Sequence, residues 1–339
     1  MDSAVAALRL IEQGRVLETA TVRLWGGSDR RSCCSPGALQ RARQTALWLG
    51  LPHTFVDREA DFAEHIVNPF VDAYVSGETP NPCVDCNPRR LAALVEFADE
   101  LGCERVATGH YARLVWRGGA PFVARGADAG KDQSYMLWAV PAEVLARLEF
   151  PLGDGTKPGT RAAAAVAGLP VAVEPESQEV CFAADGYQKF LAERGVPSAD
   201  GAIVDRAGCE VGRHLGQWRF TVGQRRGLGV SSDQPLFVLE RRAAANEIVV
   251  GPREALAASE VTLRGLVDRG LGRGAGGDGL MVQLRYRSAA VPVAALTHGP
   301  GRSAALRLAE PFEAVAPGQS AVFYRDDVVM GGGIVDAPA

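Results

Sequence analysis

The first part of the chain alternates between helical and strand-like hydrophobic patterns. Residues 2–13 have one apolar helical face, and Thr19–Trp25 alternates as a half-buried strand does. The alternation continues through further helices at 38–49, 64–76 and 89–101 and strands at 52–57 and 103–108. Strands separated by helices predict a parallel, doubly wound α/β sheet. Ligands bind such sheets beyond the carboxyl ends of the strands, where Trp25, Gly109 and His110 fall.

The pattern changes after about residue 185, where glycines multiply and strand-like segments become short. Before that point, helices are expected at 142–148 and 160–167. Beyond it, strand-like segments occur at 203–204, 219–221, 236–239 and 247–250, and, after a glycine-rich loop at 270–279, at 282–286, 303–308, 320–324 and 328–335. This texture predicts antiparallel pairing and a small β-barrel at the end of the chain.

Composition places the chain among globular proteins of two or three domains, with 339 residues, 47% of them hydrophobic and 22% charged. No apolar run approaches the roughly 20 residues of a membrane helix, and no secretory signal is visible, so no membrane association is expected. The net charge of −4 argues against indiscriminate nucleic-acid binding. Residues 205–339 nevertheless carry +2, which fits either a polyanion-facing surface or an ordinary solvated one.

The seven cysteines are an odd number in a long chain, which is unlike a secreted disulfide scaffold and indicates a reducing cytosol. Cys83 and Cys86 form a C-x-x-C pair, which together with Cys33 and Cys34 offers a zinc site or a redox pair. Adjacent cysteines are an unusual ligand spacing, so no metal is expected. Buried, inert thiols are the ordinary alternative for cysteines such as Cys103 and Cys209.

Two prolines flank Asn81 in the segment Thr79–Asn87, and each fixes its own φ and restricts the residue before it. We therefore expect a loop that presents Cys86 just ahead of the helix that starts near Arg89. The partial positive charge of a helix N-terminus favours a thiolate, whereas the neighbouring Asp85 opposes one. A reactive thiol at Cys86 is favoured by this balance.

Three further segments combine polar residues in ways that have a structural and a functional interpretation. Asp2-Ser3 opens a helix and fits an N-cap. Lys131–Tyr135 fits a capping loop or a binding loop. Gly223–Gly229 places two arginines between glycines, as either a plain turn or a phosphate contact.

Eight motifs occur in a fixed order: TPNPCVDCN (79–87), ATGHYAR (107–113), KDQSYML (131–137), SQEVCF (177–182), TVGQRRGLG (221–229), LRYRS (284–288), PGQSAVFY (317–324) and GGGIV (331–335). Each is weak alone. Together, over essentially the whole chain, they resemble the bacterial tRNA-specific 2-thiouridylases, which are PP-loop ATP-pyrophosphatase-type enzymes.

The resemblance implies three domains. An adenine nucleotide α-hydrolase-like domain would occupy residues 1–187, with helices of the central domain inserted near 148–170. A small central tRNA-binding domain would follow at 188–248, and a β-barrel at 249–339. This division agrees with the change of pattern near residue 185.

The reaction that the resemblance implies is ATP- and Mg²⁺-dependent 2-thiolation of the wobble uridine of tRNA in the cytoplasm. Adenylation of the C2 oxygen makes it a leaving group, and a cysteine persulfide supplies nucleophilic sulfur. The partners implied are tRNA and a cysteine desulfurase or sulfur-relay protein as sulfur donor.

The motif matches also imply residue roles. Cys181 resembles the persulfide carrier and Cys86 the partner nucleophile, which would close a disulfide with Cys181 as sulfur leaves. The nucleotide would contact Asp2, Ser3, Leu24 and Gly109, the last because a side chain would block it. The residues matched to tRNA contacts are Asn81, Pro82 and Cys83 around the target base, and His110, Lys131, Asp132, Gln133, Arg285, Tyr286 and Gln319 elsewhere.

Two positions depart from the family pattern. Some members carry Asp where this chain has Cys83, so Cys83 or Asp85 would have to do any acid–base work. The family also begins with a strand and the loop Ser-Gly-Gly-Val-Asp-Ser, whose amides bind phosphate, whereas this chain starts at Met1-Asp2-Ser3. Two alternatives follow, a catalytically inactive tRNA-binding homologue and a zinc or redox thiol protein.

The start of the chain supports a further hypothesis about its gene. Met1 stands where the family has Val, and GTG encodes Val internally but Met as a start codon. Arginine supplies 33 of the 36 basic residues, which is typical of a GC-rich genome. We predict that the natural protein carries roughly 8–15 more residues, an apolar strand ending in Ser-Gly-Gly. The upstream genomic DNA would decide it.

Overall fold

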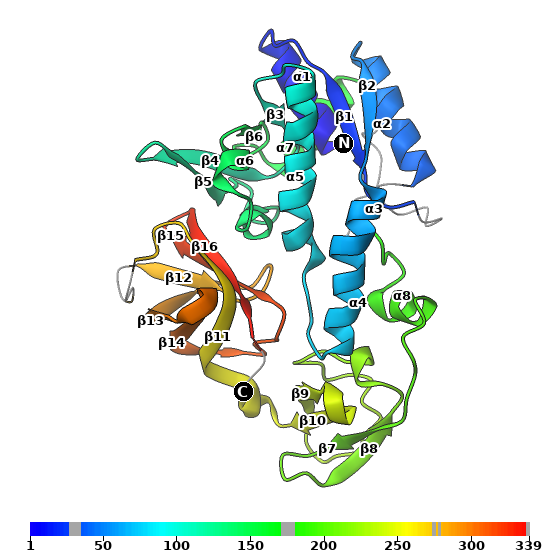
Figure 1. Cartoon of the computed structure of the whole chain (residues 1–339), viewed down its shortest axis with the longest axis vertical. Helices are drawn as coiled ribbons and strands as arrows, with labels where there is room; N and C mark the ends of the chain where they lie inside the picture. Colours follow the sequence, from blue (N-terminus) through cyan, green and yellow to red (C-terminus); the bar gives the residue numbers. More distant parts are fainter. Residues whose placement is uncertain (27–34, 171–179, 273–275, 277–278, 337–339) are drawn as a thin grey trace. The chain divides into compact units, whose positions relative to one another are not determined.

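The computed structural model describes residues 1–26, 35–170, 180–272, 276 and 279–336. The chain divides into two compact units, which are described separately here (Figure 1). Unit 1 comprises Met1–Val67, Pro82–Ala184 and Asp327–Val329, and unit 2 comprises Asn68–Asn81, Asp185–Asp326 and Met330–Ala339. This division does not test the three predicted domain boundaries, which stay predictions.

Unit 1 begins with the helices and strands that the hydrophobic pattern predicts. These are α1 (Asp2–Glu12), β1 (Thr19–Arg23), α2 (Pro36–Trp48) and β2 (His53–Asp57). Strand β1 pairs with β2 in parallel, and β3 (Val106–Ala107) pairs in parallel with β6 (Leu148–Glu149). The α/β class with parallel strands is confirmed. Among the described residues of unit 1, these parallel strands form two separate pairs, not one continuous sheet.

The loop predicted through Asn87 is wrong, because residues 82–87 form the first part of helix α5 (Pro82–Glu100). Proline fits the first position of a helix, because the N–H that it lacks has no partner there, so the helix begins at Pro82. Pro88 lies inside the helix, where it costs one backbone hydrogen bond. Cys86 therefore lies on the helix itself. Helix α5 contacts strands of both parallel pairs, which positions its side chains at the centre of unit 1 (Figure 1).

The helix expected at 64–76 is divided into three consecutive parts. Helix α3 (Glu59–Phe62) continues into a π-helical turn, η1 (Ala63–Val67), and unit 2 then begins with α4 (Asn68–Val75). Other elements of unit 1 are the hairpin β4 (Ala112–Arg117) and β5 (Ala120–Arg125), the 3₁₀ turn η2 (Ser134–Leu137), α6 (Ala142–Leu145) and α7 (Lys157–Val166). The hairpin was not predicted, and α6 is shorter than predicted because β6 follows it.

Unit 2 contains a four-stranded sheet of order β8-β7-β10-β9. Its elements are α8 (Tyr187–Glu193), β7 (Gly201–Val204), β8 (Glu210–His214), β9 (Phe237–Arg242) and β10 (Glu247–Gly251). The strand predicted at 219–221 is wrong, since Gln217–Arg219 is a 3₁₀ turn (η3). The apolar side chains of the sheet form one buried cluster that includes Ile203, Val238 and Ile248. Short 3₁₀ turns follow at η4 (Ala243–Ala245) and η5 (Arg253–Leu256).

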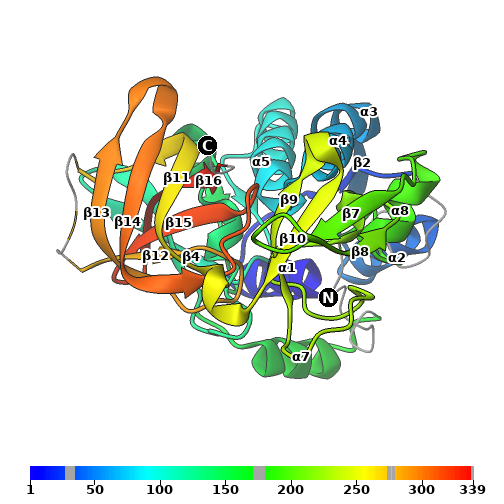
Figure 2. The ribbon, with the colours of Figure 1, turned by 90° about the horizontal axis from the view of Figure 1, so that it is seen from below.

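Six strands, all of unit 2 apart from the first two residues of the last one, close into the predicted β-barrel (Figure 2). They run in the order β11 (Ala257–Asp268), β14 (Ala304–Glu313), β13 (Val291–His298), β12 (Leu280–Gln283), β15 (Ser320–Arg325) and β16 (Val328–Val335), with the turn η6 (Pro300–Arg302) before β14. Leu263 pairs with Val335, which joins β11 to β16 and completes the ring. Gly331 permits this approach, because a Cβ there would lie 2.1 Å from the carbonyl oxygen of Val267. In the described ranges, no helix is long and apolar enough to span a bilayer.

Candidate active site

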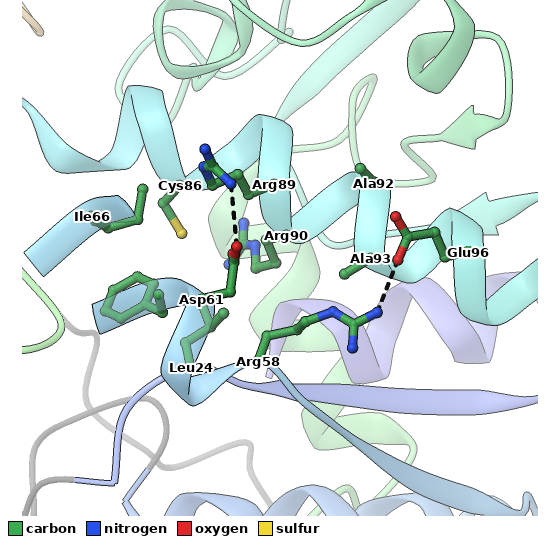
Figure 3. A pocket seen from close by; sticks show the side chains of 11 residues that line it. Leu24, Arg58, Asp61, Ile66, Cys86, Arg89, Arg90, Ala92, Ala93 and Glu96 are labelled. Atoms are coloured by element: carbon green, nitrogen blue, oxygen red, sulfur yellow. Dashed lines mark hydrogen bonds and ion pairs between the residues drawn. The ribbon is translucent and has the colours of Figure 1, made fainter. Parts of the chain in front are cut away.

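A pocket of about 370 Å³ in unit 1 is lined by the side chain of Cys86 (Figure 3). One face of α5 forms a wall of this pocket, because residues three or four apart lie on the same side of a helix. The α5 residues that line it are Cys86, Arg89, Arg90, Ala92, Ala93 and Glu96. The other lining residues come from the end of β1 and from the α3–η1 segment: Leu24, Arg58, Asp61, Phe62 and Ile66.

Two of the three arginines in the pocket are paired with carboxylates (Figure 3). Arg89 Nη1 lies 3.2 Å from Asp61 Oδ1, and Arg58 Nη2 lies 2.8 Å from Glu96 Oε2. Arg90 differs, since its Nη2 donates to Asn87 Oδ1 at 2.7 Å and to His110 Nε2 at 3.1 Å. Both acceptors of Arg90 are uncharged if His110 is neutral.

His110 is neutral and buried behind Arg90. Burial lowers its pKa to about 3, and the charge of Arg90 contributes in the same direction. Arg90 can only donate, so Nε2 of His110 accepts and Nδ1 carries the proton, which it donates to Thr108 Oγ1 at 2.7 Å. Both ring nitrogens of His110 are thus bonded inside unit 1. Its contact with tRNA stays a prediction.

Cys181 lies in a turn of unit 1 and is half-buried. The next residue, Phe182, packs with its ring centroid 5.7 Å from that of Phe62 and 6.1 Å from that of Trp25. Phe62 lines the Cys86 pocket, so the segment that carries Cys181 packs against a wall of that pocket. Ser177, Gln178 and Glu179 lie outside the described residues. Both cysteines are thiols here, and a disulfide between them stays a prediction.

Three of the predicted nucleotide-binding residues lie together at the start of α1. Gly109 follows β3, and a Cβ on it would lie 2.6 Å from the backbone nitrogen of Ser3 and 2.7 Å from the carbonyl carbon of Asp2. Glycine is therefore required where the chain passes the helix start. Helix α1 has no side-chain cap, and Ser3 is exposed. The fourth predicted residue, Leu24, is buried and lines the Cys86 pocket.

The side chain of Lys157 is bonded to Asp2, a contact that the sequence analysis does not predict. Lys157 Nζ lies 2.8 Å from each carboxylate oxygen of Asp2, and Lys157 is buried. The hydroxyl of Tyr111 lies 3.1 Å from Asp2 Oδ1 and 2.9 Å from Thr160 Oγ1. Burial raises the pKa of Tyr111 to about 12, so this hydroxyl keeps its proton. The available signal was composition, because the arginine-rich chain has only three lysines.

The segment Lys131–Gln133 is largely bonded within unit 1. Asp132 accepts hydrogen bonds from the backbone nitrogens of Gly126 and Ser134 and pairs with Arg125 at 3.0 Å. Gln133 Oε1 accepts from the backbone nitrogen of Tyr111 at 2.9 Å, and Lys131 is half-buried. A role of these residues in tRNA binding stays a prediction.

In unit 2, the chain leading to Asn81 is fixed by buried side chains. Arg241 donates to three carbonyl oxygens, those of Gly77 at 3.1 Å, Phe220 at 2.9 Å and Glu78. Gln319 Nε2 donates to the carbonyl oxygen of Thr79, so this predicted tRNA residue has a structural role. No local pattern indicates this role of Arg241, because its partners lie more than 20 residues away.

The remaining predicted residues differ in exposure. Asn81 is half-buried, Pro82 is buried and Cys83 is exposed. Arg285 is exposed and Tyr286 half-buried in the turn after β12. Within the part of the chain that the structure describes, no cluster of three or more His, Cys, Asp or Glu side chains could hold a metal ion. Cys33 and Cys34 lie outside that part.

The α/β part of the chain carries a cysteine-lined pocket, and a four-stranded sheet and a closed barrel follow it along the sequence. The families that match these parts are named for tRNA-modifying proteins. The family described as "tRNA methyl transferase HUP domain" matches residues 1–185, the corresponding PRC-barrel domain matches 188–252, and the "Aminomethyltransferase beta-barrel domain" matches 278–335.

Similar proteins narrow this class. The chain is 41% identical to the tRNA-specific 2-thiouridylase MnmA of Geobacter metallireducens, over 99% of this chain and 94% of the relative. It is 43% identical to the MnmA of Sorangium cellulosum, over 99% and 90%. It is also 44% identical to the bifunctional protein NifU/MnmA of Rubrobacter xylanophilus, over 99% of this chain and 68% of that protein. The chain belongs to the tRNA-specific 2-thiouridylase family.

Proposed function

We propose that the chain uses ATP to adenylate the C2 oxygen of the wobble uridine of tRNA, and then replaces that oxygen with sulfur from a cysteine persulfide. Family membership gives the reaction class. The observation that supports the residue assignment is the packing of Phe182 on Phe62, because it brings the segment of Cys181 to the pocket of Cys86. Neither the inactive homologue nor the zinc or redox protein is favoured by a comparable observation.

The sulfur transfer can be written with Cys181 as carrier and Cys86 as nucleophile. The C2 oxygen attacks the α-phosphorus of ATP, and pyrophosphate leaves. Cys86 then attacks the sulfur of Cys181 in the Cys181 persulfide, which forms a disulfide and releases hydrosulfide. Hydrosulfide adds to C2, and AMP leaves with the former C2 oxygen. A cellular dithiol supplies the two electrons that return the disulfide to two thiols.

The residues at the start of α1 fit a nucleotide phosphate. Helix N-termini carry partial positive charge, and Gly109 lets the chain after β3 lie directly against the backbone of Asp2 and Ser3 at this helix start. Asp2, with Lys157 beside it, and Ser3 would face the phosphates, and Leu24 would contact the adenine. Mg²⁺ would neutralise phosphate charge during adenylation.

Transfer of sulfur to Cys181 requires a donor protein, which we infer to be a cysteine desulfurase or a sulfur-relay protein. The fusion of NifU to MnmA in Rubrobacter xylanophilus supports a link to sulfur handling in a similar protein. The tRNA would be bound by Arg285, Tyr286 and the other matched residues. Asn81, Pro82 and Cys83 would surround the target base.

Serine replacements of the two cysteines test this assignment. Cys86→Ser and Cys181→Ser should each abolish ATP-dependent formation of 2-thiouridine, measured by mass spectrometry of nucleosides from tRNA, while tRNA affinity stays close to that of the parent. Cys103→Ser and Cys209→Ser are matched controls that should keep activity. Thiolation by either Cys86→Ser or Cys181→Ser would refute the assignment.

A further inference from the structure

The arginines around Cys86 are not equivalent in charge balance. Arg89 is paired with Asp61 and Arg58 with Glu96, so each of these pairs contributes little net charge to the pocket. No carboxylate of the described chain pairs with Arg90, whose side-chain partners are Asn87 and the neutral His110. The pocket wall therefore retains one positive charge, at Arg90.

Arg90 is also held in place. Asn87 accepts from Arg90 through Oδ1 and donates through Nδ2 to the carbonyl oxygen of Met136 at 3.0 Å. His110 is fixed in turn by its bond to Thr108. Since the two buried acceptors are themselves anchored, the guanidinium of Arg90 cannot leave the wall without breaking both hydrogen bonds.

Cys86 and Arg90 are four residues apart on α5, so their side chains lie on one face of the helix, and both line the pocket. Figure 3 shows the sulfur of Cys86 and the guanidinium of Arg90 directed into the same space. A cation that lines the same pocket as a thiol favours the ionised form of the thiol. We propose that Arg90 is a positioning residue for Cys86, whose thiolate it stabilises before attack.

Other charges near the pocket could act on the same thiol. The titratable or charged groups around it in the described chain are Arg58, Asp61, Arg89 and Glu96 in the lining, Cys83 and Asp85 on the same helix, His65 bonded to Asp61, and His110 behind Arg90. The lining pairs are balanced and His110 is neutral, and Asp85 is the acidic side chain next to Cys86 on the same helix. Asp85 is exposed, so water screens it more than the half-buried Arg90.

This inference rests on the proposed role of Cys86, and its test does not use thiolation activity. The rate of alkylation of Cys86 by iodoacetamide is measured against pH, with the modified peptide identified by mass spectrometry. Arg90→Gln keeps an N–H donor but removes the charge, and its alkylation midpoint should move up by about one pH unit. Arg90→Lys restores the charge and should recover at least half of that shift. Arg90→Met serves if Arg90→Gln does not fold.

The matched control removes a balanced pair from the same pocket. Arg58→Gln combined with Glu96→Gln deletes one cation and one anion, and should leave the midpoint within a few tenths of a pH unit. A midpoint unchanged in Arg90→Gln, or an Arg90→Lys variant that behaves like Arg90→Gln, would overturn the inference. If instead Cys86→Ser thiolates tRNA while the Arg90 variants shift the midpoint as expected, the proposed function fails and the inference about the thiol stands.

Discussion

The parallel strands of unit 1 and the barrel of unit 2 obtain their stability in different ways. In the barrel, six strands close through the pairing of β11 with β16, so every strand has hydrogen-bonded neighbours on both sides. In unit 1, β1–β2 and β3–β6 are separate pairs among the described residues. Closure removes free strand edges, whereas isolated two-stranded pairs are marginal and depend on what packs against them.

Side chains supply the missing connections in unit 1. Lys157 joins α7 to Asp2 on α1, Gly109 lets the chain after β3 approach the start of α1, and Arg147 joins the segment before β6 to Asp99 on α5. The candidate active site is built from the same kind of contacts. The comparison indicates that charged and polar side chains in unit 1 serve both the fold and the chemistry, while the barrel is held by its backbone ladder and apolar core.

The largest expected effect comes from breaking the barrel where it closes. Leu263 is fully buried on β11 and pairs with Ala304 on β14 and Val335 on β16. Leu263→Ala should lower the free energy of unfolding by about 2–5 kcal/mol, because it leaves a cavity at the junction. Urea denaturation followed by circular dichroism measures it. The exposed neighbour Thr262→Ala is the control and should change stability by less than about 0.5 kcal/mol. A loss below that level for Leu263→Ala would contradict the account of the barrel.

A smaller loss of stability is expected at acidic pH, and it arises in unit 1, from the protonation of His110. The folded chain holds His110 neutral with a pKa of about 3, whereas an unfolded histidine has a pKa near 6.5. The unfolded state therefore binds the extra proton first as the pH falls. The stability from this histidine is fully present above pH 6.5 and is lost as the pH falls toward 3. One proton changes the free energy of unfolding by at most about 1.4 kcal/mol per pH unit. The loss of stability between pH 6.5 and pH 5 is therefore at most roughly 2 kcal/mol.

Denaturation curves at several pH values test this prediction. His110→Asn has no proton to gain in this range, so its stability should depend less on pH than that of the parent. His214 in unit 2 also has a pKa lowered by burial, and His214→Asn provides the comparison with a second buried histidine. Identical pH dependence in the parent and His110→Asn would show that His110 is not held neutral.

The sequence predicts structure that depends on neighbouring residues better than contacts between residues that are far apart in the chain. Hydrophobic periodicity identified α1, β1, α2 and β2 nearly to the residue. Alternation identified the barrel strands β12, β14, β15 and β16 but missed β11 and β13. The start of α5 was misplaced because Pro82 was read as a helix breaker, although proline is compatible with the first helical position. The order of the motifs identified the family, since that information is spread over the whole chain.

The details of the site could not be read from local sequence. Gln319 bonds to Thr79, Lys157 to Asp2, and Arg241 to Gly77, pairs that are 240, 155 and 164 residues apart. Nothing in the local pattern of a segment specifies such partners. Nor does it show that a polar motif residue is used internally, as the carboxylate of Asp132 is by Ser134.

The smallest change in stability is expected at the start of α7, the helix of unit 1 that carries Lys157. Thr156 is the N-cap of α7, and its Oγ1 accepts from the backbone nitrogen of Gly159 at 3.3 Å. Thr156→Ala should cost about 1 kcal/mol, whereas Thr156→Ser keeps the acceptor and should cost less.

Asp128 Oδ2 accepts from the backbone nitrogen of Lys157 at 2.8 Å, so a second acceptor remains at this helix end. Combining Thr156→Ala with Asp128→Ala should therefore cost more than the sum of the single changes. Additive losses in a double-mutant cycle would mean that the two caps act independently. Losses near zero for both single variants and for the double variant would mean that the start of α7 is held by packing and not by its polar contacts.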